Sequence, residues 1–596
     1  MKKFLFCVSL ACAGLTTSCI DKNEEVDADS RPSWLGESIY AELKNPADHG
    51  LLNGTFTNYL RLIDDLGYDE VLAKTGSKTV FPANDEAFGR FFQSNDWGVA
   101  SYEQLTEAQK KLLLNSSMLD NALLLGMLPN VYNGTNEVMK GQAVKHSTNV
   151  SLIDSVQFIA GSGSESVRPA GMPANNKYWQ SHYRKGIHVV KDATVPMMVH
   201  LTREYMLNND IKVAGGEGSD FAYITGEPYS EGTAYIFNDK VANGNVTCQN
   251  GYIHQMEDVV TPPGNMAQML QRKTNTKYFS RIIDYFSLPY YSATTTKYYN
   301  DWAIANNRPT IDSIFEVRYL SSWSHSSSSD DGSENPFPRL PNGQIVTSDA
   351  KKLSFDPGWN WFYPKVASAG STDVKIMDMG AIFVPSDDAI KDFFLQGGTG
   401  AYLVDIYGKY KDAENTAEHL AENLDSIHAK NPSVLTEFVN NLLQESFARS
   451  VPSKFGTITN DASELLGVTT DMIVRKDDGK CDISIANNGV LYVLNTLISP
   501  DRFQSVMGPS SVYPDMSVMG WAVDDTPGVL GVDYQYYLKA MRANFAFFVP
   551  DDDAFSLYYL DPASMGHEVN GQVQPDVLHR SEEHTSELQS HHDLVC

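Results

Sequence analysis

Cysteine and positive charge are both scarce in this sequence. Its 596 residues include six Cys, and 74 Asp and Glu stand against 46 Lys and Arg, which gives a formal net charge of −28. A chain this acidic repels nucleic acid, so we expect no nucleic-acid partner. Away from the two ends of the chain only Cys248 and Cys481 remain, in separate predicted domains. This pattern excludes a disulfide framework and favours two small buried apolar side chains.

The sequence also lacks the signatures of the common enzyme classes. It contains no Gly-x-Ser-x-Gly elbow, no His-Glu-x-x-His motif, no phosphate-binding glycine-rich loop and no dinucleotide fingerprint. His182, His188 and His200 lie near one another, but their spacing matches no metal-ligand pattern. We therefore expect no enzymatic activity, no cofactor and no metal site.

The hydrophobic run at the N-terminus is too short to cross a membrane as a permanent helix. It covers residues 4–15, follows two lysines, and indicates a secretory signal peptide, which we place at 1–18. The residues from Thr16 to Cys19 resemble a bacterial lipobox, so Cys19 is the predicted lipidation site, carrying palmitate or similar acyl chains. The alternative is ordinary cleavage after Ala13, which would leave Cys19 unmodified.

Both ends of the chain carry segments outside the predicted fold. Residues 19–34 predict an acidic tether, and the Lys-and-acid cluster behind Cys19 is similar to the export tag of some Gram-negative lipoproteins. We therefore expect an outer-membrane lipoprotein that is exposed at the cell surface. Residues 580–596 are similar to an in-frame translation of a sequencing adapter, so we interpret them as an artefact and assign no site there.

One phrase occurs three times in the chain. It reads TVFPANDEAF at 79–88, AIFVPSDDAI at 381–390 and AFFVPDDDAF at 546–555. Repetition of this kind indicates an array of one module. The apolar residues of each copy predict a buried strand end. A helix N-cap is predicted three residues after the shared Phe, at Asn84, Ser386 and Asp551. The acids that follow would lie in the first helical turn, where the helix dipole favours negative charge. A catalytic or metal-binding pair of acids is the alternative.

A second phrase closes the module and occurs twice. It reads NGYIHQMEDVVTP at 250–262 and NGVLYVLNTLISP at 488–500, so Tyr492 takes the place of His254. The Asn-Gly pair predicts a two-residue hairpin turn, because both residues tolerate positive φ. The residues after it predict a buried strand that Pro262 and Pro500 end.

These two phrases, in this order, resemble those of the fasciclin domain. The resemblance implies an α+β fold of tandem fasciclin-type domains, each a wedge-shaped β-sandwich or partial barrel with helices packed on one side. It places domain 1 at 35–263, domain 2 at 264–503 and a partial domain 3 at 504–579. The sequence departs from the family pattern at Pro82, which is one place early, and at Tyr492. Domains 1 and 2 are longer than is usual for the family, so we expect strand-rich insertions in both.

The insertion predicted in domain 2 is rich in aromatic residues. Aromatic side chains on loops can stack on sugar rings or anchor a protein partner. They could instead pack the insertion onto its own domain, which is the interpretation that we favour. The candidate ligand-binding residues are Trp302, Trp323, Trp359, Trp361 and Tyr363.

The fasciclin resemblance implies adhesion or scaffold work without chemistry. We expect a protein anchored to the membrane by its N-terminal lipid, which binds a surface protein, an extracellular-matrix component or a polysaccharide. The alternative is an outer-membrane glycan-capture lipoprotein associated with a nutrient importer, with the aromatic insertion as its sugar platform. The helical tandem repeats usual in that class are missing from the sequence.

Overall fold

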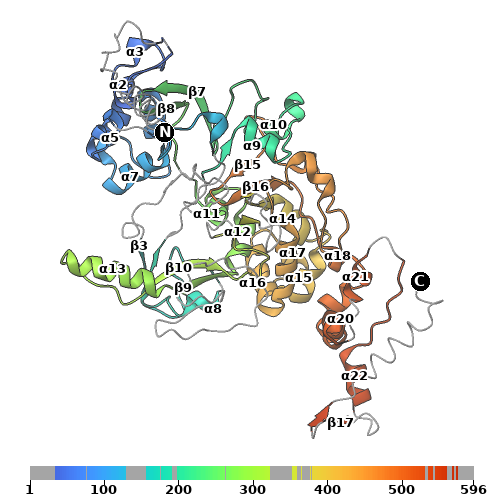
Figure 1. The fold of residues 1–596 in the computed structure, drawn as a ribbon. Coiled ribbons are helices and arrows are strands. Elements are labelled where there is room, and N and C mark those ends of the chain that lie inside the picture. The colour runs from blue at the N-terminus through green and yellow to red at the C-terminus, as the bar shows by residue number, and fades with distance from the viewer. Residues whose placement is uncertain are drawn as a thin grey trace, which may run out of the picture. The chain divides into compact units, whose positions relative to one another are not determined.

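The structure is a computed structural model. It describes residues 32, 34–74, 77–128, 156–174, 176–190, 198–261, 263–321, 352–358, 364–365, 376–377, 379–529, 534–540, 544–559, 567–569 and 572–574. The chain divides into two compact units, of which the first comprises residues 1–105, 117–125 and 241–260 and the second the remainder. The fold is α+β with mixed sheets, as expected (Figure 1). Within the described part of the chain, no helix combines the length and apolar character needed to cross a membrane.

The first compact unit is built on a mixed sheet. Its strands run in the order β2-β1-β8-β7, with β1 parallel to β8 and the other pairs antiparallel. The elements that contribute to it are α2 (Ile39–Lys44), α3 (Pro46–His49), α4 (Thr57–Asp65), α5 (Asp69–Lys74), β1 (Lys78–Val80), α6 (Asp85–Gln93), β2 (Met118–Leu119), β7 (Asp239–Cys248) and β8 (Gly251–Met256).

The second compact unit contains a sheet of the same design, in the order β14-β13-β16-β15, with β13 parallel to β16. Its elements up to residue 319 are α7 (Glu107–Ser116), β3 (Val156–Ala160), α8 (Lys177–Gln180), β4 (Gly186–Val190), β5 (His200–Leu201), α9 (Arg203–Asn208), α10 (Asp220–Thr225), β6 (Tyr235–Ile236), α11 (Met266–Arg272), α12 (Lys277–Asp284), β9 (Ser287–Tyr291), α13 (Ala293–Ala305) and β10 (Ile314–Tyr319). Those that follow are β11 (Pro364–Lys365), β12 (Ile376–Met377), β13 (Gly380–Pro385), α14 (Asp387–Phe394), α15 (Ala401–Tyr407), α16 (Leu420–Lys430), α17 (Pro432–Leu442), β14 (Leu443–Gln444), β15 (Ile483–Ile485), β16 (Gly489–Leu494), α18 (Asp501–Gln504), α19 (Gly508–Val512), α20 (Ser517–Val529), α21 (Tyr534–Lys539), α22 (Asp552–Tyr559), β17 (His567–Val569) and β18 (Gln572–Gln574).

The repeated phrases occupy equivalent places in the two sheets. We call the strand-to-helix segments 78–93, 380–394 and 544–559 corners 1, 2 and 3, and the segments 239–256 and 483–494 hairpins 1 and 2. In corner 1 Thr79 lies opposite Tyr252, and in corner 2 Ala381 lies opposite Val490. These are the same positions of the two phrases, so both modules pair the opening strand with the closing strand in one register.

The predicted N-caps are confirmed in all three corners. Each cap side chain accepts a hydrogen bond from the backbone amide three residues later, at 3.0 Å for Asn84, 3.2 Å for Ser386 and 2.8 Å for Asp551. A cap of this kind satisfies one of the amides that the first helical turn leaves unpaired.

The first acid of each phrase also accepts hydrogen bonds from the start of a second helix, in addition to its favourable place in the helix dipole. Asp85 accepts hydrogen bonds from the amides of Thr57 and Asn58, at the start of α4. Asp387 binds the start of α12 in the same way, and Asp552 the start of α20. These acids therefore join two helices that are far apart in sequence, a structural role that accounts for them without catalysis or metal.

The Asn of each closing phrase lies in the turn between two paired strands, as predicted, and its side chain also holds a helix. In hairpin 1 the turn is shifted by one residue from the expected Asn-Gly pair. The two-residue loop of hairpin 1 is Gln249–Asn250, because Cys248 pairs with Gly251. The side-chain oxygen of Asn250 accepts from the amide of Ile39 at 2.8 Å, at the start of α2. Asn488 accepts from the amide of Met266 at 2.8 Å, at the start of α11. Each Asn thus ties the last hairpin of its module to the first helix.

The Gly of the closing phrase is required by close packing of the two strands. A Cβ on Gly251 would lie 1.9 Å from the carbonyl oxygen of Lys78, and φ at Gly251 is +150°. A Cβ on Gly489 would lie 2.7 Å from the carbonyl oxygen of Gly380. The strands β8 and β16 end at Met256 and Leu494, before the prolines that were expected to end them.

His254 and Tyr492 occupy the same position of the closing phrase, and each packs against the Phe of the opening phrase in its own module. The ring centroids of Phe81 and His254 are 5.5 Å apart, as are those of Phe383 and Tyr492. Nδ1 of His254 accepts from the amide of Asn245 and Nε2 donates to the carbonyl of Leu123, both at 2.9 Å, which fixes a neutral tautomer. Burial lowers the pKa of His254 to about 4.

Corner 3 differs from the prediction. No strand is formed at 546–550 among the described residues, and the Phe548 side chain is 75% exposed, whereas Phe81 and Phe383 are buried. The expectation of a buried strand end is therefore wrong for this copy. The physical reason is that a parallel closing strand covers corners 1 and 2, while no described strand pairs with corner 3.

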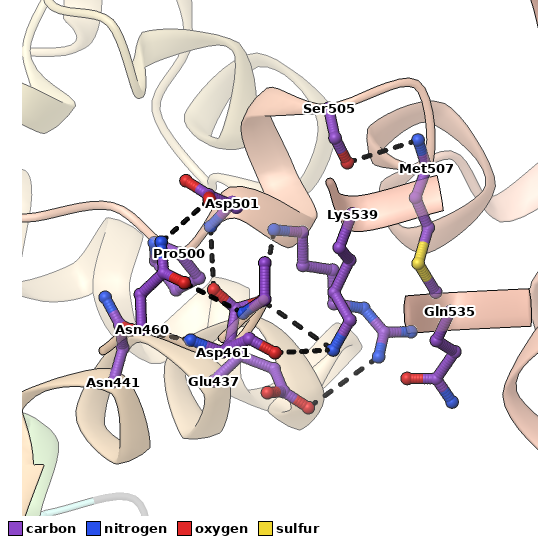
Figure 2. A network of polar contacts seen from close by, with 12 residues as sticks. Glu437, Asn441, Asn460, Asp461, Pro500, Asp501, Ser505, Met507, Gln535 and Lys539 are labelled. Carbon is purple, nitrogen blue, oxygen red and sulfur yellow. Dashed lines mark hydrogen bonds and ion pairs between the residues drawn. The ribbon is translucent and has the colours of Figure 1, made fainter. Parts of the chain in front are cut away.

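A polar network joins the end of module 2 to the helices of corner 3 (Figure 2). The carboxylate of Asp461 accepts from the amides of Asp501 and Arg502, which caps α18. Nζ of Lys539, on α21, donates to the carbonyl oxygen of Asp461 at 3.1 Å. Arg502 binds both carboxylate oxygens of Asp524, on α20, at 2.7 Å. These bonds attach α20 and α21 to the preceding module.

Candidate binding surface

A second sheet of the second compact unit combines strands from the two domains that the sequence analysis predicted. Its order is β3-β4-β10-β9, and the central strands β4 and β10 are parallel, with His188 opposite Ile314. β3 and β4 come from predicted domain 1, and β9 and β10 from predicted domain 2. This sheet therefore combines residues from both sides of the expected 263/264 boundary. The domain boundaries themselves stay a prediction.

Side chains from the segment before β4 fix the two halves of this sheet together. The indole Nε1 of Trp179 donates to the hydroxyl of Ser287 at 2.8 Å, and the amide of Asn176 donates to the carbonyl oxygens of Ser287 and Asp284. Trp179 is buried in an apolar cluster with Met172, Tyr183, Ile187, Val189 and Phe315. Tight packing of this kind gives a rigid platform, which is what a preorganised binding surface needs.

A buried ion pair lies on β10. The guanidinium of Arg318 is 2.5 Å from the carboxylate of Glu316 and its centre is 4.0 Å from the ring centroid of Tyr290. Both charged side chains are almost fully buried. Removing charges from water is costly unless they are paired, and the aromatic face adds support. This pair is a structural feature of the sheet, and Tyr290 is buried beside it.

Two carboxyl groups near the ends of the sheet have a raised pKa. Burial raises the pKa of Asp284 and of Asp356 to about 6. Such shifts often mark catalytic groups. Here Asp356 accepts from the amides of Tyr319 and Gly358, and Asp284 accepts from Gln271 at 3.2 Å, so the fold itself uses both carboxyls. Among the described residues, no group of His, Cys, Asp and Glu could hold a metal ion.

Helix α13 lies next to β10 (Figure 1), and polar side chains hold it there. The hydroxyl of Thr296 accepts from the amide of Ile314 at 3.0 Å. The side-chain amide of Asn300 both donates to and accepts from the backbone of Ile311, each at 2.8 Å. These bonds fix the rotation of the helix about its axis, so the residues on its flanks have defined positions.

One flank of α13 presents aromatic side chains to solvent. Tyr298 and Trp302 are four residues apart and therefore share this flank. Tyr298 is 54% exposed and Trp302 half-buried, with the ring centroids of Trp302 and Tyr299 5.7 Å apart. Ile304, on the opposite flank, is 67% exposed. Paired aromatic rings on a fixed helix are suited to stacking on a flat apolar face of a partner.

A second exposed aromatic lies on the edge strand β3. Phe158 is 56% exposed, and its ring centroid is 4.7 Å from that of His188 on β4. Burial lowers the pKa of His188, and the nearby Asp312 acts in the opposite direction. At neutral pH the Phe158–His188 pair is therefore a mainly uncharged surface at the edge of the sheet.

The structure describes only part of the predicted site, whose role stays a prediction. Of the candidate ligand-binding residues, Trp302 lies on the aromatic flank of α13. The other candidates lie outside the described residues, as does the lipidation site: Trp323, Trp359, Trp361, Tyr363 and Cys19.

Sequence reasoning missed two contributors to this surface. Tyr298 has a signal, since it precedes Trp302 by one helical turn in a segment without helix breakers. Phe158 has a weaker one, the short, mainly apolar run from Val156 to Ala160, which is compatible with a strand. Its exposure depends on which strand it pairs with, and local sequence does not specify that.

Other titratable groups considered in the sequence are structural. The ring of His182 packs against Phe315 with centroids 5.0 Å apart, and burial lowers its pKa. Cys248 and Cys481 are buried free thiols, as expected. Burial raises the pKa of Cys248 to about 12, so its thiol is unreactive at neutral pH.

Comparison with known proteins gives a distant structural likeness. A scan against protein-family models finds no match, and a search of curated proteins finds none either. Among solved structures, the chain is similar to a FAS1 domain pair from the insect cell adhesion molecule fasciclin I, with 10% sequence identity and a TM-score of 0.16. The match covers 78% of this chain and 96% of that chain. So low a TM-score carries no argument of its own, and the account of the fold depends on the repeated corners and hairpins.

Proposed function

We propose that this chain is a non-enzymatic adhesion or scaffold protein of the cell envelope, built from fasciclin-type modules. It is anchored by acyl chains on Cys19 and binds a protein, matrix or glycan partner. The observation that carries this proposal is the equivalence of the two modules, in which Thr79–Tyr252 and Ala381–Val490 occupy the same register. Duplication of one module gives a chain several binding surfaces at separate places. Linked surfaces bind a partner with higher avidity than one surface, which is an advantage for adhesion.

The use of polar side chains supports binding without chemistry. Asp85 and Asp387, which the sequence offered as possible catalytic acids, hold the starts of helices. His254 has both ring nitrogens bonded to the backbone and is neutral at physiological pH. A general base needs a nitrogen or oxygen that can reach a substrate, and these groups are engaged by the fold.

The proposal is tested by displaying the whole protein on cells. The full chain and a Cys19→Ala variant are expressed in a Gram-negative host, and surface exposure is measured by protease shaving of intact cells. We expect the unchanged chain to be displayed and to retain cells on a surface coated with its partner, screened over envelope proteins, matrix proteins and polysaccharides. Cys19→Ala cells should lose display and adhesion together.

Two results would contradict the proposal. One is efficient display with no adhesion on any surface of the screen. The other is undiminished display of the Cys19→Ala variant, which would remove the lipid anchor from the account.

A second candidate, glycan capture, is favoured by the aromatic flank of α13. Tyr298 and Trp302 are placed on a helix whose orientation is fixed by Thr296 and Asn300. Aromatic faces of this kind stack on sugar rings. Retention of the protein by an immobilised polysaccharide, lost in a Tyr298→Ala/Trp302→Ala variant, would favour capture, and retention by protein surfaces alone would favour adhesion.

A further inference from the structure

One part of the second compact unit is basic, although the chain as a whole is strongly acidic. Residues 156–190, from β3 to β4, contain four basic residues and one acidic residue, which are Arg168, Lys177, Arg184, Lys185 and Glu165. The flanking sequence keeps this sign, because residues 129–197 together contain seven Lys and Arg and four Asp and Glu. The whole chain has a net charge of −28. We call residues 156–190 the basic lobe.

Hydrogen bonds tie together the two ends of the loop that joins β3 to β4 in the basic lobe. The amide of Ser162 donates to the carbonyl oxygen of Tyr183 at 2.8 Å, and the amide of Gly163 donates to that of Arg184 at 3.1 Å. One face of β4 packs on the apolar cluster that contains Trp179. The basic residues are therefore carried by a backbone with defined positions, as a preorganised binding surface requires.

The basic side chains of the lobe are exposed. Lys177 and Lys185 form no ion pair with any residue that the structure describes. Arg184 is 3.6 Å from Glu165, but both side chains are mostly exposed, and an ion pair in water is weak. At physiological ionic strength, exposed charges interact over only about 8 Å. The local positive charge therefore decides which ligands the lobe attracts, since more distant acidic residues are screened.

An exposed aromatic ring lies beside these basic residues. The ring centroids of Phe158 and His188 are 4.7 Å apart, and a Cβ at Gly186 would lie 2.9 Å from the tip of the Phe158 ring. Gly186 directly follows Lys185 in the chain. Asp312 is the acid that acts on His188 and borders this surface. Phe158 is still 56% exposed, so part of its ring is open to a ligand.

A charged sugar polymer fits this surface better than a protein does. Protein interfaces are usually centred on several large apolar side chains. In the described part of the lobe, the exposed large apolar residues are Phe158 and Val167 alone. An acidic sugar unit offers an anionic group that a Lys or Arg can bind, and a flat C–H face that an aromatic ring can cover.

We propose that the basic lobe is a binding site for an anionic polysaccharide. Lys177, Arg184 and Lys185 bind its carboxylate or sulfate groups. One of its sugar rings stacks on Phe158. This inference rests on the proposed function, because it names the class of glycan that the adhesion or scaffold protein holds. It differs from stacking on the aromatic flank of α13, where Lys297 and Asp301 pair with each other and leave no excess positive charge.

The experiment measures binding of the full chain to polygalacturonate and to heparin by calorimetry at 50 and 150 mM salt. We expect saturable binding to at least one of them, weaker at the higher salt concentration. A Lys177→Gln/Lys185→Gln variant should bind about threefold to tenfold more weakly and depend less on salt. Phe158→Ala should weaken binding by about tenfold. These side chains are exposed, so both variants should fold as the unchanged chain does.

Two further polymers and one variant serve as controls. Poly-glutamate has carboxylates without sugar rings, and dextran has sugar rings without charge. Each should bind at least about tenfold more weakly than the anionic polysaccharide, and Phe158→Ala should not change the binding of poly-glutamate. Lys74→Gln/Lys297→Gln removes two lysines outside the basic lobe that are 70% and 77% exposed, and it should bind as the unchanged chain does.

Four results overturn the proposal. These are absence of binding to both anionic polysaccharides, undiminished binding by Lys177→Gln/Lys185→Gln, equal binding of poly-glutamate, which would indicate an acidic polypeptide as partner, and self-association of the chain that the same variant abolishes in light scattering. If cells that display the chain still adhere in these cases, the proposed function stands and only the class of glycan is wrong. Loss of adhesion on every surface would instead contradict the proposed function itself.

Discussion

The rings of Phe81 and His254 lie 5.5 Å apart, and Phe383 and Tyr492 repeat that separation in the second module. The two positions are equivalent in the sequence and in the strand pairing, so one structural role is filled by an imidazole in one module and a phenol in the other. An imidazole has a pKa of about 6.5 in an unfolded chain, whereas a phenol has a pKa of about 10. The duplicated modules should therefore differ in their response to acid.

We predict that acid destabilises the first compact unit through His254. Burial holds the pKa of His254 at about 4, below the value of about 6.5 for a histidine in an unfolded chain. The neutral ring is favoured by folding, so the stability is fully present above pH 6.5 and is lost as the pH falls towards 4, by about 3 kcal/mol at most. Calorimetry of the full chain at pH 7.5 and 4.5 measures this loss as a shift of the unfolding transition.

A His254→Tyr variant is the corresponding test, because it copies module 2. It should lower stability at pH 7.5 through loss of the bonds to Asn245 and Leu123, yet remove most of the difference between the two pH values. His419→Gln, in the second compact unit, is the control and should leave the pH dependence of the first unit intact. An unchanged pH dependence in His254→Tyr would show that another group is responsible.

The two acids of corner 1 should differ in their effect on stability. Asp85 accepts from Thr57, Asn58 and the hydroxyl of Thr55, whereas Glu86 is exposed and pairs with Arg90. Asp85→Ala should reduce the free energy of unfolding by about 1–3 kcal/mol because α4 loses its cap. Glu86→Ala should change it by less than about 0.5 kcal/mol. Denaturant titration of both variants measures the contrast, and equal effects would favour a helix-dipole role for both acids.

A methyl group at the start of the closing strand should disrupt the module. Gly251→Ala places Cβ against the carbonyl oxygen of Lys78 and strains a backbone with φ of +150°. We expect a loss of more than about 2 kcal/mol in the free energy of unfolding. Gly89→Ala is the matched control, because that glycine is helical and its Cβ meets no atom within 4 Å; it should stabilise by about 0.5–1 kcal/mol. If Gly251→Ala is tolerated as well as Gly89→Ala, β1 and β8 do not approach as described.

The aromatic flank of α13 should carry partner binding if it is the adhesion surface. A Tyr298→Ala/Trp302→Ala variant should weaken retention of the partner about tenfold or more, because exposed aromatic side chains contribute heavily to interfaces. Ile304→Ala removes a side chain of comparable exposure from the opposite flank and should have little effect. Affinity measured on the immobilised partner separates the two. Equal loss in both variants would point to a general effect on the helix.

Local features of the fold could be predicted from sequence, and long-range ones could not. The caps Asn84, Ser386 and Asp551 were predicted because a cap and its amide are three residues apart. Asn250 lies in the turn as predicted, but the sequence did not predict that its side chain binds Ile39. That bond spans 211 residues, and no local pattern encodes it.

The same distinction applies to the candidate site. The aromatic composition around Trp302 was visible in the sequence, and the helical spacing of Tyr298 and Trp302 follows from it. The parallel pairing of β4 with β10 joins segments from two predicted domains. Such pairing depends on the chain returning to the same place, which hydrophobic periodicity alone does not determine. The exposed Phe548 likewise reflects the lack of a described pairing partner, although its phrase matches the other two.

The most direct test of the account is to identify the partner on intact cell surfaces and to ask whether it is changed. The full chain is used to capture surface components, and the captured partner is incubated with excess protein for several hours before its mass is measured. The account predicts saturable binding and a partner of unchanged mass, with binding reduced in Tyr298→Ala/Trp302→Ala. Turnover of the partner into a product of different mass would contradict it.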